Sequence, residues 1–217
     1  MKMSLDHHQL ADFLARQINN LIPDGNTVRM ADIMPHLDMI MDRTQHCFSS
    51  INNKYFFDGH EAVFNHLHAD QYAMLLYLVC NTLYKNGADI GLCTKICQLN
   101  KYLHGIDAFY EIELPDIFLF VHPLGTVLGR GTYGDYFLVY QRCGIGSNHD
   151  VYPVMKEFVT LRPGSSILGN CLVEANCTIA AGSLLLDRSL EKNTLYIGNP
   201  RDHVIRTKSE ILPIWKH

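Results

Sequence analysis

The stretch that decides the fold reads PVMKEFVTLRPGSSILGNCLVEANCTIAAGSLL and spans residues 153–185. Large apolar residues recur in it at every sixth position, and a mostly small residue stands two positions before each. The large residues are Met155, Leu161, Ile167, Val173, Ile179 and Leu185, and their partners are Pro153, Val159, Ser165, Cys171, Cys177 and Ser183. A period of six is typical of a parallel β-helix, in which three hexapeptides make one triangular coil.

The same period extends toward the N-terminus after one interruption. A first series of rungs, also six residues apart, is Val121, Val127, Tyr133, Val139 and Ile145. The step from Ile145 to Met155 is ten residues, so about four residues must leave the coil there. We therefore expect residues 146–153 to form a protruding loop, which their Gly, Asn, Asp and Pro content favours. A β-sandwich is disfavoured because its strands would alternate with a period of two.

The first half of the chain has helical periodicity. Apolar residues spaced by three and four indicate helices, and Gly or Pro signals end them. The expected helical segments are His7–Leu21, Met30–Ile51 with a break near Pro35, Tyr72–Tyr84, and Ile90–His104. We predict a helical N-terminal domain over residues 1–117, a β-helix over residues 118–206 and a C-terminal tail over residues 207–217.

Composition narrows the class of protein. Of 217 residues, 47% are apolar and 18% are charged, which suits a folded core and excludes wholesale disorder. The apolar runs are too short to cross a bilayer, and no secretory signal stands out. Lys and Arg are scattered in a chain of net charge −4, which argues against nucleic acid or a membrane surface as partner.

The seven cysteines indicate a reducing compartment, and we expect a cytoplasmic protein. Their number is odd, and their spacing is unlike a disulfide framework. Cys93 and Cys97 share a helical face, but no second pair stands at a zinc-finger spacing. We interpret the thiols as small apolar residues and predict no metal site.

From about residue 60 to residue 206 the chain resembles serine O-acetyltransferases. In that family a helical N-terminal domain is followed by a left-handed β-helix of hexapeptide repeats, so the resemblance implies the same α plus β-solenoid fold. The matching segments are Val121–Pro123, Val127–Gly131, Ile167–Asn170, Ile179–Ser183 and Ile197–Arg201. The last three are shared among hexapeptide acyltransferases in general. The chain looks most like divergent members found in surface-polysaccharide gene clusters.

The resemblance implies an acetyl-CoA-dependent acyltransferase that acts on the hydroxyl of a small-molecule acceptor. It also implies a homotrimer, with a dimer of trimers left open, and a co-substrate that lies in the groove between two β-helices. A histidine would act as general base, and no metal is needed. The residues implied for binding acetyl-CoA are Ala180, Ala181, Gly182, Gly198, Asn199, Pro200 and Arg201.

The chain departs from the family where the base would stand. The family has Asp-His after its Gly-Arg-Gly turn, and here these positions are Asp135 and Tyr136. The position of the aspartate that partners the family's base is Phe120, and the family's loop histidine aligns with Tyr152. The usual pair of catalytic side chains is therefore missing.

Two other histidines are candidates for the base, namely His149 in the protruding loop and His122 before Pro123. We interpret His66 and His68, next to Asp70, as solvated surface residues. Acceptor recognition is assigned to polar residues of the first coils and the segment before them. These candidate substrate-binding residues are Asp107, Asp135, Gln141 and Tyr140.

Three functions stay open from the sequence. The first is an O-acetyltransferase of the serine acetyltransferase type. The second is an enzyme that acetylates a sugar or nucleotide-sugar for a surface polysaccharide. The third is a catalytically silent trimeric homologue, which the three substitutions favour and the retained segments for binding acetyl-CoA disfavour.

Overall fold

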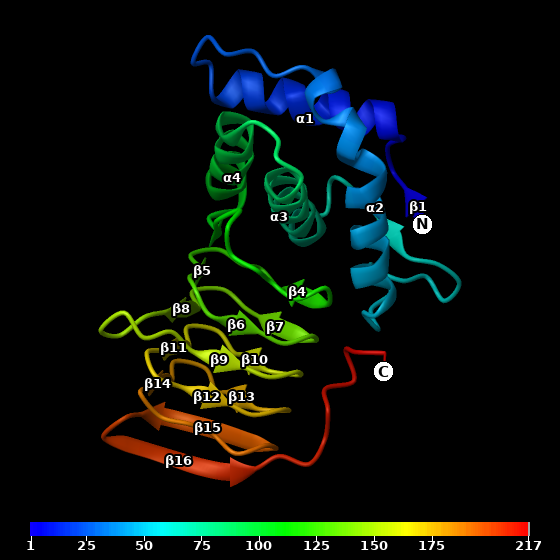
Figure 1. Ribbon diagram of the computed structural model, residues 1–217. Helices are drawn as coiled ribbons and strands as arrows, with labels where there is room; N and C mark the ends of the chain where they lie inside the picture. Colours follow the sequence, from blue (N-terminus) through cyan, green and yellow to red (C-terminus); the bar gives the residue numbers. More distant parts are fainter. Residues whose placement is uncertain (217) are drawn as a thin grey trace.

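A computed structural model describes residues 1–216 as a helical layer on one end of a β-helix (Figure 1). Two short parallel strands, β1 (Lys2–Met3) and β2 (Val63–Phe64), join the start of the chain to the segment before α3. None of the helices in residues 1–216 is long and apolar enough to cross a membrane. The helices are α1 (His7–Leu21), the 3-10 turn η1 (Met30–Asp32), α2 (Met34–Ser49), α3 (Ala69–Lys85) and α4 (Ile90–His104).

Local signals explain where the helices begin and end. The Asp6 side chain accepts a hydrogen bond from the backbone N–H of Gln9, and the Gln9 side chain accepts one from the backbone of Asp6. This reciprocal pair starts α1. Pro35 lies in the first turn of α2, where its missing N–H costs nothing. Gly105 ends α4 at a φ of 62°, a conformation that favours glycine. The four helices predicted from periodicity, with the break near Pro35, are confirmed.

The second half is a parallel β-helix, as predicted, with three sheets around a triangular core. The first sheet contains β4 (Phe118–Phe120), β7 (Phe137–Val139), β10 (Thr160–Leu161), β13 (Thr178–Ile179), β15 (Thr194–Asn199) and β16 (Asp202–Thr207). The second contains β3 (Asp107–Ala108), β5 (Val127–Leu128), β8 (Gly144–Gly146), β11 (Ser166–Leu168) and β14 (Leu184–Leu186). The third contains β6 (Thr132–Tyr133), β9 (Val154–Met155) and β12 (Leu172–Val173).

The rungs after the loop fill the core as predicted, but the first two rungs before it do not. All six large residues from Met155 to Leu185 are at most 1% exposed. Val127, in contrast, is 50% exposed, and its neighbour Leu128 pairs with Ile145 and points inward. Phe120 takes the inward position predicted for Val121, because it pairs with Val139. The first coil has corners of unequal length, so a strict period of six does not describe it.

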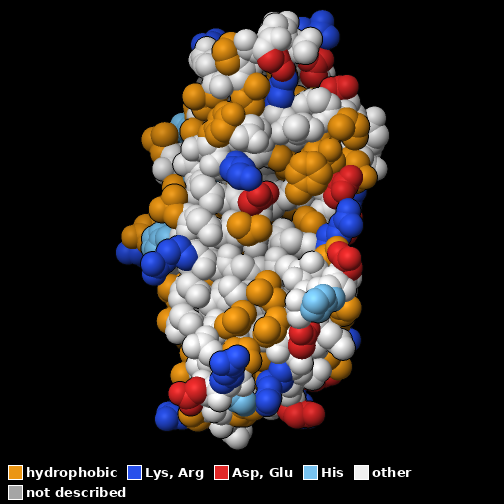
Figure 2. All heavy atoms as spheres, turned by 90° about the vertical axis from the view of Figure 1, so that its left-hand side faces the viewer, with side chains coloured by type: hydrophobic (Ala, Val, Ile, Leu, Met, Phe, Trp, Pro, Cys, Tyr) orange, Lys and Arg blue, Asp and Glu red, His pale blue; other side chains and the backbone are white. Residues whose placement is uncertain are grey.

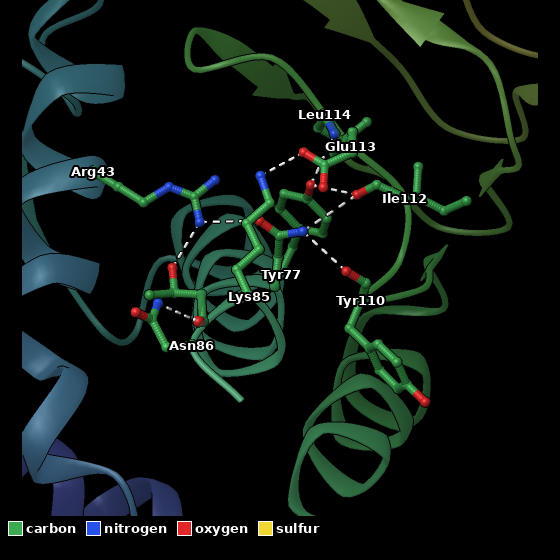
Figure 3. A network of polar contacts seen from close by, with 10 residues as sticks. Arg43, Tyr77, Lys85, Asn86, Tyr110, Ile112, Glu113 and Leu114 are labelled. Atoms are coloured by element: carbon green, nitrogen blue, oxygen red, sulfur yellow. Dashed lines mark hydrogen bonds and ion pairs between the residues drawn. The ribbon is translucent and has the colours of Figure 1, made fainter. Parts of the chain in front are cut away.

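Polar contacts fix the helical layer to the first coil (Figure 3). The Tyr77 hydroxyl, from α3, donates to the carbonyl of Ile112 at 2.7 Å and accepts from the backbone N–H of Leu114 at 2.8 Å. Arg43, from α2, donates to Asn81, whose side chain donates in turn to the carbonyl of Tyr110. Because these partners are buried, the contacts hold the segment before β4 in one position relative to the helices.

The C-terminal tail, residues 208–216, runs back along the β-helix to the lower end of α2 (Figure 1). Trp215 forms an isolated antiparallel bridge with Ile51 and is only 4% exposed. The backbone N–H of Asn52 donates to the carbonyl of Ile214 at 2.6 Å, and that of Lys216 donates to the carbonyl of Ser50 at 2.9 Å. The tail therefore joins the far end of the β-helix to the helical layer.

Candidate functional site

One edge of the β-helix carries a column of side chains, at the corner where the chain leaves the first sheet for the second. Strand register places Val121, Tyr140, Arg162 and Ala180 one below another on successive coils, since each follows a paired strand end. Backbone hydrogen bonds link the coils, as from Tyr140 to Leu161 at 3.2 Å and from Arg162 to Ile179 at 3.0 Å. We call these four residues the edge column.

A pocket of about 510 Å³ lies at the upper end of the edge column, where the β-helix meets the helical layer. Its size is in the range of pockets for small molecules. Four segments form it: the loop before β2, the start of α3, the first coils and the tail. The lining residues are Asn52, Asn53, Tyr55, Phe56, His68, Asp70, Leu119, Phe120, Val121, His122, Leu138, Tyr140, Arg162, Leu212, Pro213 and Ile214.

His122 and Asp70 meet in this pocket, although they are 52 residues apart in the chain. The backbone N–H of His122 donates to Asp70 Oδ1 at 3.1 Å, and Nδ1 of its ring lies 3.7 Å from Asp70 Oδ2. The Asp70 side chain is 12% exposed, whereas that of His122 is 75% exposed. The imidazole can therefore meet a ligand while a largely buried carboxylate stands behind it. His68, interpreted above as a solvated surface residue, lines this pocket together with Asp70.

Tyr140 and Arg162 form a second polar group in the pocket. The Arg162 guanidinium donates to the Tyr140 hydroxyl at 3.1 Å and lies over the Tyr140 ring, 5.2 Å from its centroid. Two contacts with one tyrosine hold a long, flexible side chain in place. Tyr140 is thus a predicted site residue that lies in the pocket, and Arg162 is one that the sequence analysis missed.

The predicted protruding loop exists as a short hairpin at a different corner, between the second and third sheets. Asn148 and Val151 form an antiparallel bridge, with His149 and Asp150 at its tip at φ values of 50° and 58°. The Asn148 side chain donates to Asp187 at 2.5 Å. The pKa of Asp187 is lowered, chiefly by a hydrogen bond from the backbone N–H of Asn170. His149 is exposed, and the pocket that holds His122 does not include it.

Three predicted acceptor residues lie outside the lining of this pocket. Asp107 forms an ion pair with Lys101 at 2.6 Å. Asp135 accepts a hydrogen bond from the backbone N–H of Ile117 at 3.0 Å and lines another hollow with Lys85 and other residues. Gln141 follows Tyr140, and its Oε1 is buried without a hydrogen-bond partner among the described residues. Their roles stay predictions.

The segments predicted to bind acetyl-CoA continue the edge column below Arg162. Ala180 lies on the coil below Arg162, and Gly182 has a φ of 68° at the same corner. A Cβ added to Gly182 would meet nothing within 4 Å, so the edge is open there. Gly198–Arg201 turns the chain from β15 into β16, where Asn199 pairs with Asp202. Across residues 1–216, no three His, Cys, Asp or Glu side chains are grouped so that they could hold a metal ion.

Proteins similar to this chain in sequence are named serine acetyltransferases. A protein named serine acetyltransferase from Staphylococcus epidermidis is 28% identical over 144 residues, which cover 64% of this chain and 66% of that protein. One from Synechococcus elongatus is 24% identical over 147 residues, 65% of this chain and 59% of that protein. The chain thus matches slightly less than two thirds of the length of these relatives. No family model matches it.

Solved structures show the same fold. The serine acetyltransferase of Brucella abortus in complex with coenzyme A superposes with a TM-score of 0.73 at 18% identity, over 96% of this chain and 85% of the other. A serine acetyltransferase in complex with cysteine gives 0.71 at 17% identity, over 94% and 80%. The chain resembles serine acetyltransferases in sequence and in fold. The resemblance found in the sequence is therefore confirmed, with this chain a divergent case.

Proposed function

We propose that this chain is an acetyl-CoA-dependent acyltransferase that moves an acetyl group to the hydroxyl of a small-molecule acceptor. The observation that carries the proposal is that His122 and Asp70 share a pocket at the head of the edge column. That column leads to Ala180 and Gly182, which match the family's segments for binding the co-substrate. The sequence likeness to serine acetyltransferases supports the same chemistry.

His122 is the general base in this proposal. Its ring accepts the proton of the acceptor hydroxyl, so the oxygen can attack a carbonyl carbon beside it. The carboxylate of Asp70, 3.7 Å from Nδ1, favours the tautomer that leaves the other ring nitrogen free to accept that proton. When bound, acetyl-CoA supplies the activated acetyl group as a thioester. The proton held by His122 then returns to the leaving sulfur, which restores the base.

The open edge fits a long, thin co-substrate. Gly182 leaves space for it, and backbone groups at the corner can hydrogen-bond an amide-rich arm. Gly198–Arg201 lies at the far end of the same β-helix and supplies a cation, Arg201, for the phosphates of the nucleotide. His122 at one end and Arg201 at the other thus define the direction in which acetyl-CoA binds.

A homotrimer belongs to the same proposal. Figure 2 shows hydrophobic side chains gathered on the face of the β-helix that carries β5, β8, β11 and β14. Val127 of β5 is 50% exposed on this face, and Leu184 and Leu186 of β14 point outward three strands away in the same sheet. Burying such a face between copies would offset its cost in water. Light scattering during gel filtration should then give three times the 24.7 kDa of one chain.

The function is tested by following thiol release from acetyl-CoA with a thiol reagent. The acceptor panel contains L-serine, other hydroxy-amino acids, sugars, sugar phosphates and nucleotide-sugars. The proposal expects release that depends on one acceptor class. If every acceptor fails and calorimetry detects no binding of CoA, the chain is a catalytically silent homologue. Release with sugar derivatives alone would select modification of a carbohydrate.

A further inference from the structure

The pocket has an acidic side and a basic side. The proposed general base, His122, lies on the acidic side. Asp70 and His122 form the side next to α3, and Asp70 is the carboxylate among the lining residues. Arg162 forms the other side, two coils below Val121. Strands in a sheet are about 4.8 Å apart, so the backbone of Arg162 lies roughly 10 Å from that of Val121.

Arg162 lacks an acidic partner in the described structure. Its guanidinium donates a hydrogen bond to the Tyr140 hydroxyl and lies over the Tyr140 ring, and neither contact supplies negative charge. Lys208 is a second cation nearby. Burial lowers the pKa of Lys208, and the charge of Arg162 adds a smaller effect in the same direction. A half-buried guanidinium without an acidic partner is expected to bind an anion.

The other lining residues indicate the size and chemical character of a ligand that would fit the pocket. Leu119, Leu138 and Leu212 make part of the lining apolar, and Tyr55 and Tyr140 add two aromatic side chains to it. A cavity of about 510 Å³ is large for a free amino acid such as serine. Rings and apolar walls suit the faces of a larger ring-shaped molecule.

We propose that Arg162 binds an anionic group, a phosphate or a carboxylate, of an acceptor larger than serine, while His122 deprotonates a hydroxyl at the acceptor's other end. This inference rests on the proposed function and names the acceptor class: a hydroxyl compound with an acidic group several bonds away, as in a phosphorylated sugar. The planar guanidinium can donate two parallel hydrogen bonds to either anion. Tyr140 is a positioning residue that holds it.

The binding test separates the acceptor's anion site from the phosphates of CoA. CoA is first titrated into the protein by calorimetry, and inorganic phosphate is then titrated into the CoA-saturated protein. We expect phosphate to bind wild type with millimolar affinity and Arg162→Gln about ten-fold or more weakly, because a hydrogen-bonded charge is lost. Arg162→Lys should retain part of the affinity. Arg142→Gln is the matched control, since Arg142 is exposed on the same coil and outside the pocket lining.

Each result bears on a separate claim. If CoA binds but phosphate does not, or if Arg162→Gln binds phosphate as wild type does, the inference is wrong and the proposed function stands. If Arg162→Gln weakens CoA instead, the guanidinium serves the co-substrate and the inference also fails. If wild type binds no CoA, the proposed function itself fails. Thermal unfolding of the variants shows that a lost affinity is not a lost fold.

The kinetic test uses matched acceptors from the activity panel. An acceptor with a phosphate or carboxylate should be acetylated at a higher kcat/KM than its neutral counterpart, as for glucose 1-phosphate or glucuronate against glucose. Arg162→Gln should raise KM for the acidic acceptor about ten-fold or more and leave KM for acetyl-CoA within two-fold. Equal efficiency with neutral and acidic acceptors would overturn the inference.

Discussion

The rings of Tyr136 and Phe158 lie parallel, with centroids 4.3 Å apart and an interplanar angle of 5°. Trp215 approaches Tyr136 edge-on at 5.6 Å. Tyr136 stands where the resemblance to serine acetyltransferases puts the catalytic histidine. In this chain that position thus belongs to an aromatic cluster that includes Trp215 of the C-terminal tail. The absence of the usual base thus has a structural counterpart, and the proposed function assigns its role to His122 with Asp70 behind it.

The aromatic cluster predicts that the tail is a stabilising part of the fold. Trp215→Ala should lower the free energy of unfolding by about 3 kcal/mol, because a large buried ring is lost. Urea unfolding followed by circular dichroism measures the change. The matched control is Tyr102→Ala, since Tyr102 is 59% exposed, and its effect should stay within about 0.5 kcal/mol. Equal stability of Trp215→Ala and wild type would show that the tail does not pack as described.

Asp70→Asn tests the carboxylate behind His122. Asparagine can still accept the hydrogen bond from the backbone of His122, so the change removes the charge and keeps that contact. We expect kcat to fall about ten-fold or more while KM for acetyl-CoA stays near the wild-type value. An unchanged kcat at an unchanged melting temperature would exclude Asp70 from the mechanism.

Acid should destabilise the chain through His104. Burial lowers the pKa of His104 from 6.5 to about 4, because the charged ring is poorly solvated. Between these values the unfolded chain binds a proton that the folded chain does not, so stability falls as the pH falls. The loss is at most about 1.4 kcal/mol per pH unit. His104→Gln should show a smaller decline between pH 6.5 and 4 in urea unfolding, and an equal decline would contradict the assignment.

The buried thiols should react slowly in the folded protein. Burial raises the pKa of Cys47 to about 12 and that of Cys93 to about 11, so both stay protonated at pH 8. Since the thiolate is the reactive form, iodoacetamide should label them at a small fraction of the rate seen in urea. Mass spectrometry of digests taken over time gives the two rates. Rapid labelling of Cys47 in the native protein would contradict its burial.

The hairpin tip predicts a stabilising substitution. Asp150 has a φ of 58°, which costs a residue with a Cβ but not glycine. Asp150→Gly should raise the free energy of unfolding by about 0.5 kcal/mol. Asp42→Gly is the control with the opposite sign, because Asp42 lies within α2, where glycine costs about 1 kcal/mol. A loss of stability in both variants would show that the tip is not strained.

Periodicity predicted the fold well because it depends on residues close together in the chain. The six buried rungs from Met155 to Leu185 and the bounds of α1 and α4 follow from local spacing. The exceptions are Val121 and Val127, in a first coil whose corners are irregular where it meets the helices.

The site was harder to predict, because long-range folding brings its parts together. Asp70 comes from α3, His122 from the first coil and Ile214 from the tail, and nothing in their local sequence links them. Arg162 stands inside the most regular part of the repeat, at a corner position that takes Tyr140 one coil above and Ala180 one coil below. The large charged side chain at this corner of a regular repeat was the feature of the sequence that could have indicated a role for Arg162 in the site.

The most direct measurement of the central claim is the rate of acceptor-dependent thiol release from acetyl-CoA by His122→Gln, His149→Gln and wild type. His46→Gln, an exposed residue of α2 outside the pocket, serves as control. The account predicts that kcat falls about 10²- to 10⁴-fold in His122→Gln, as expected for loss of a general base, and stays near wild type in His46→Gln. Full activity of His122→Gln, with the loss found in His149→Gln instead, would contradict it and move the base to the hairpin.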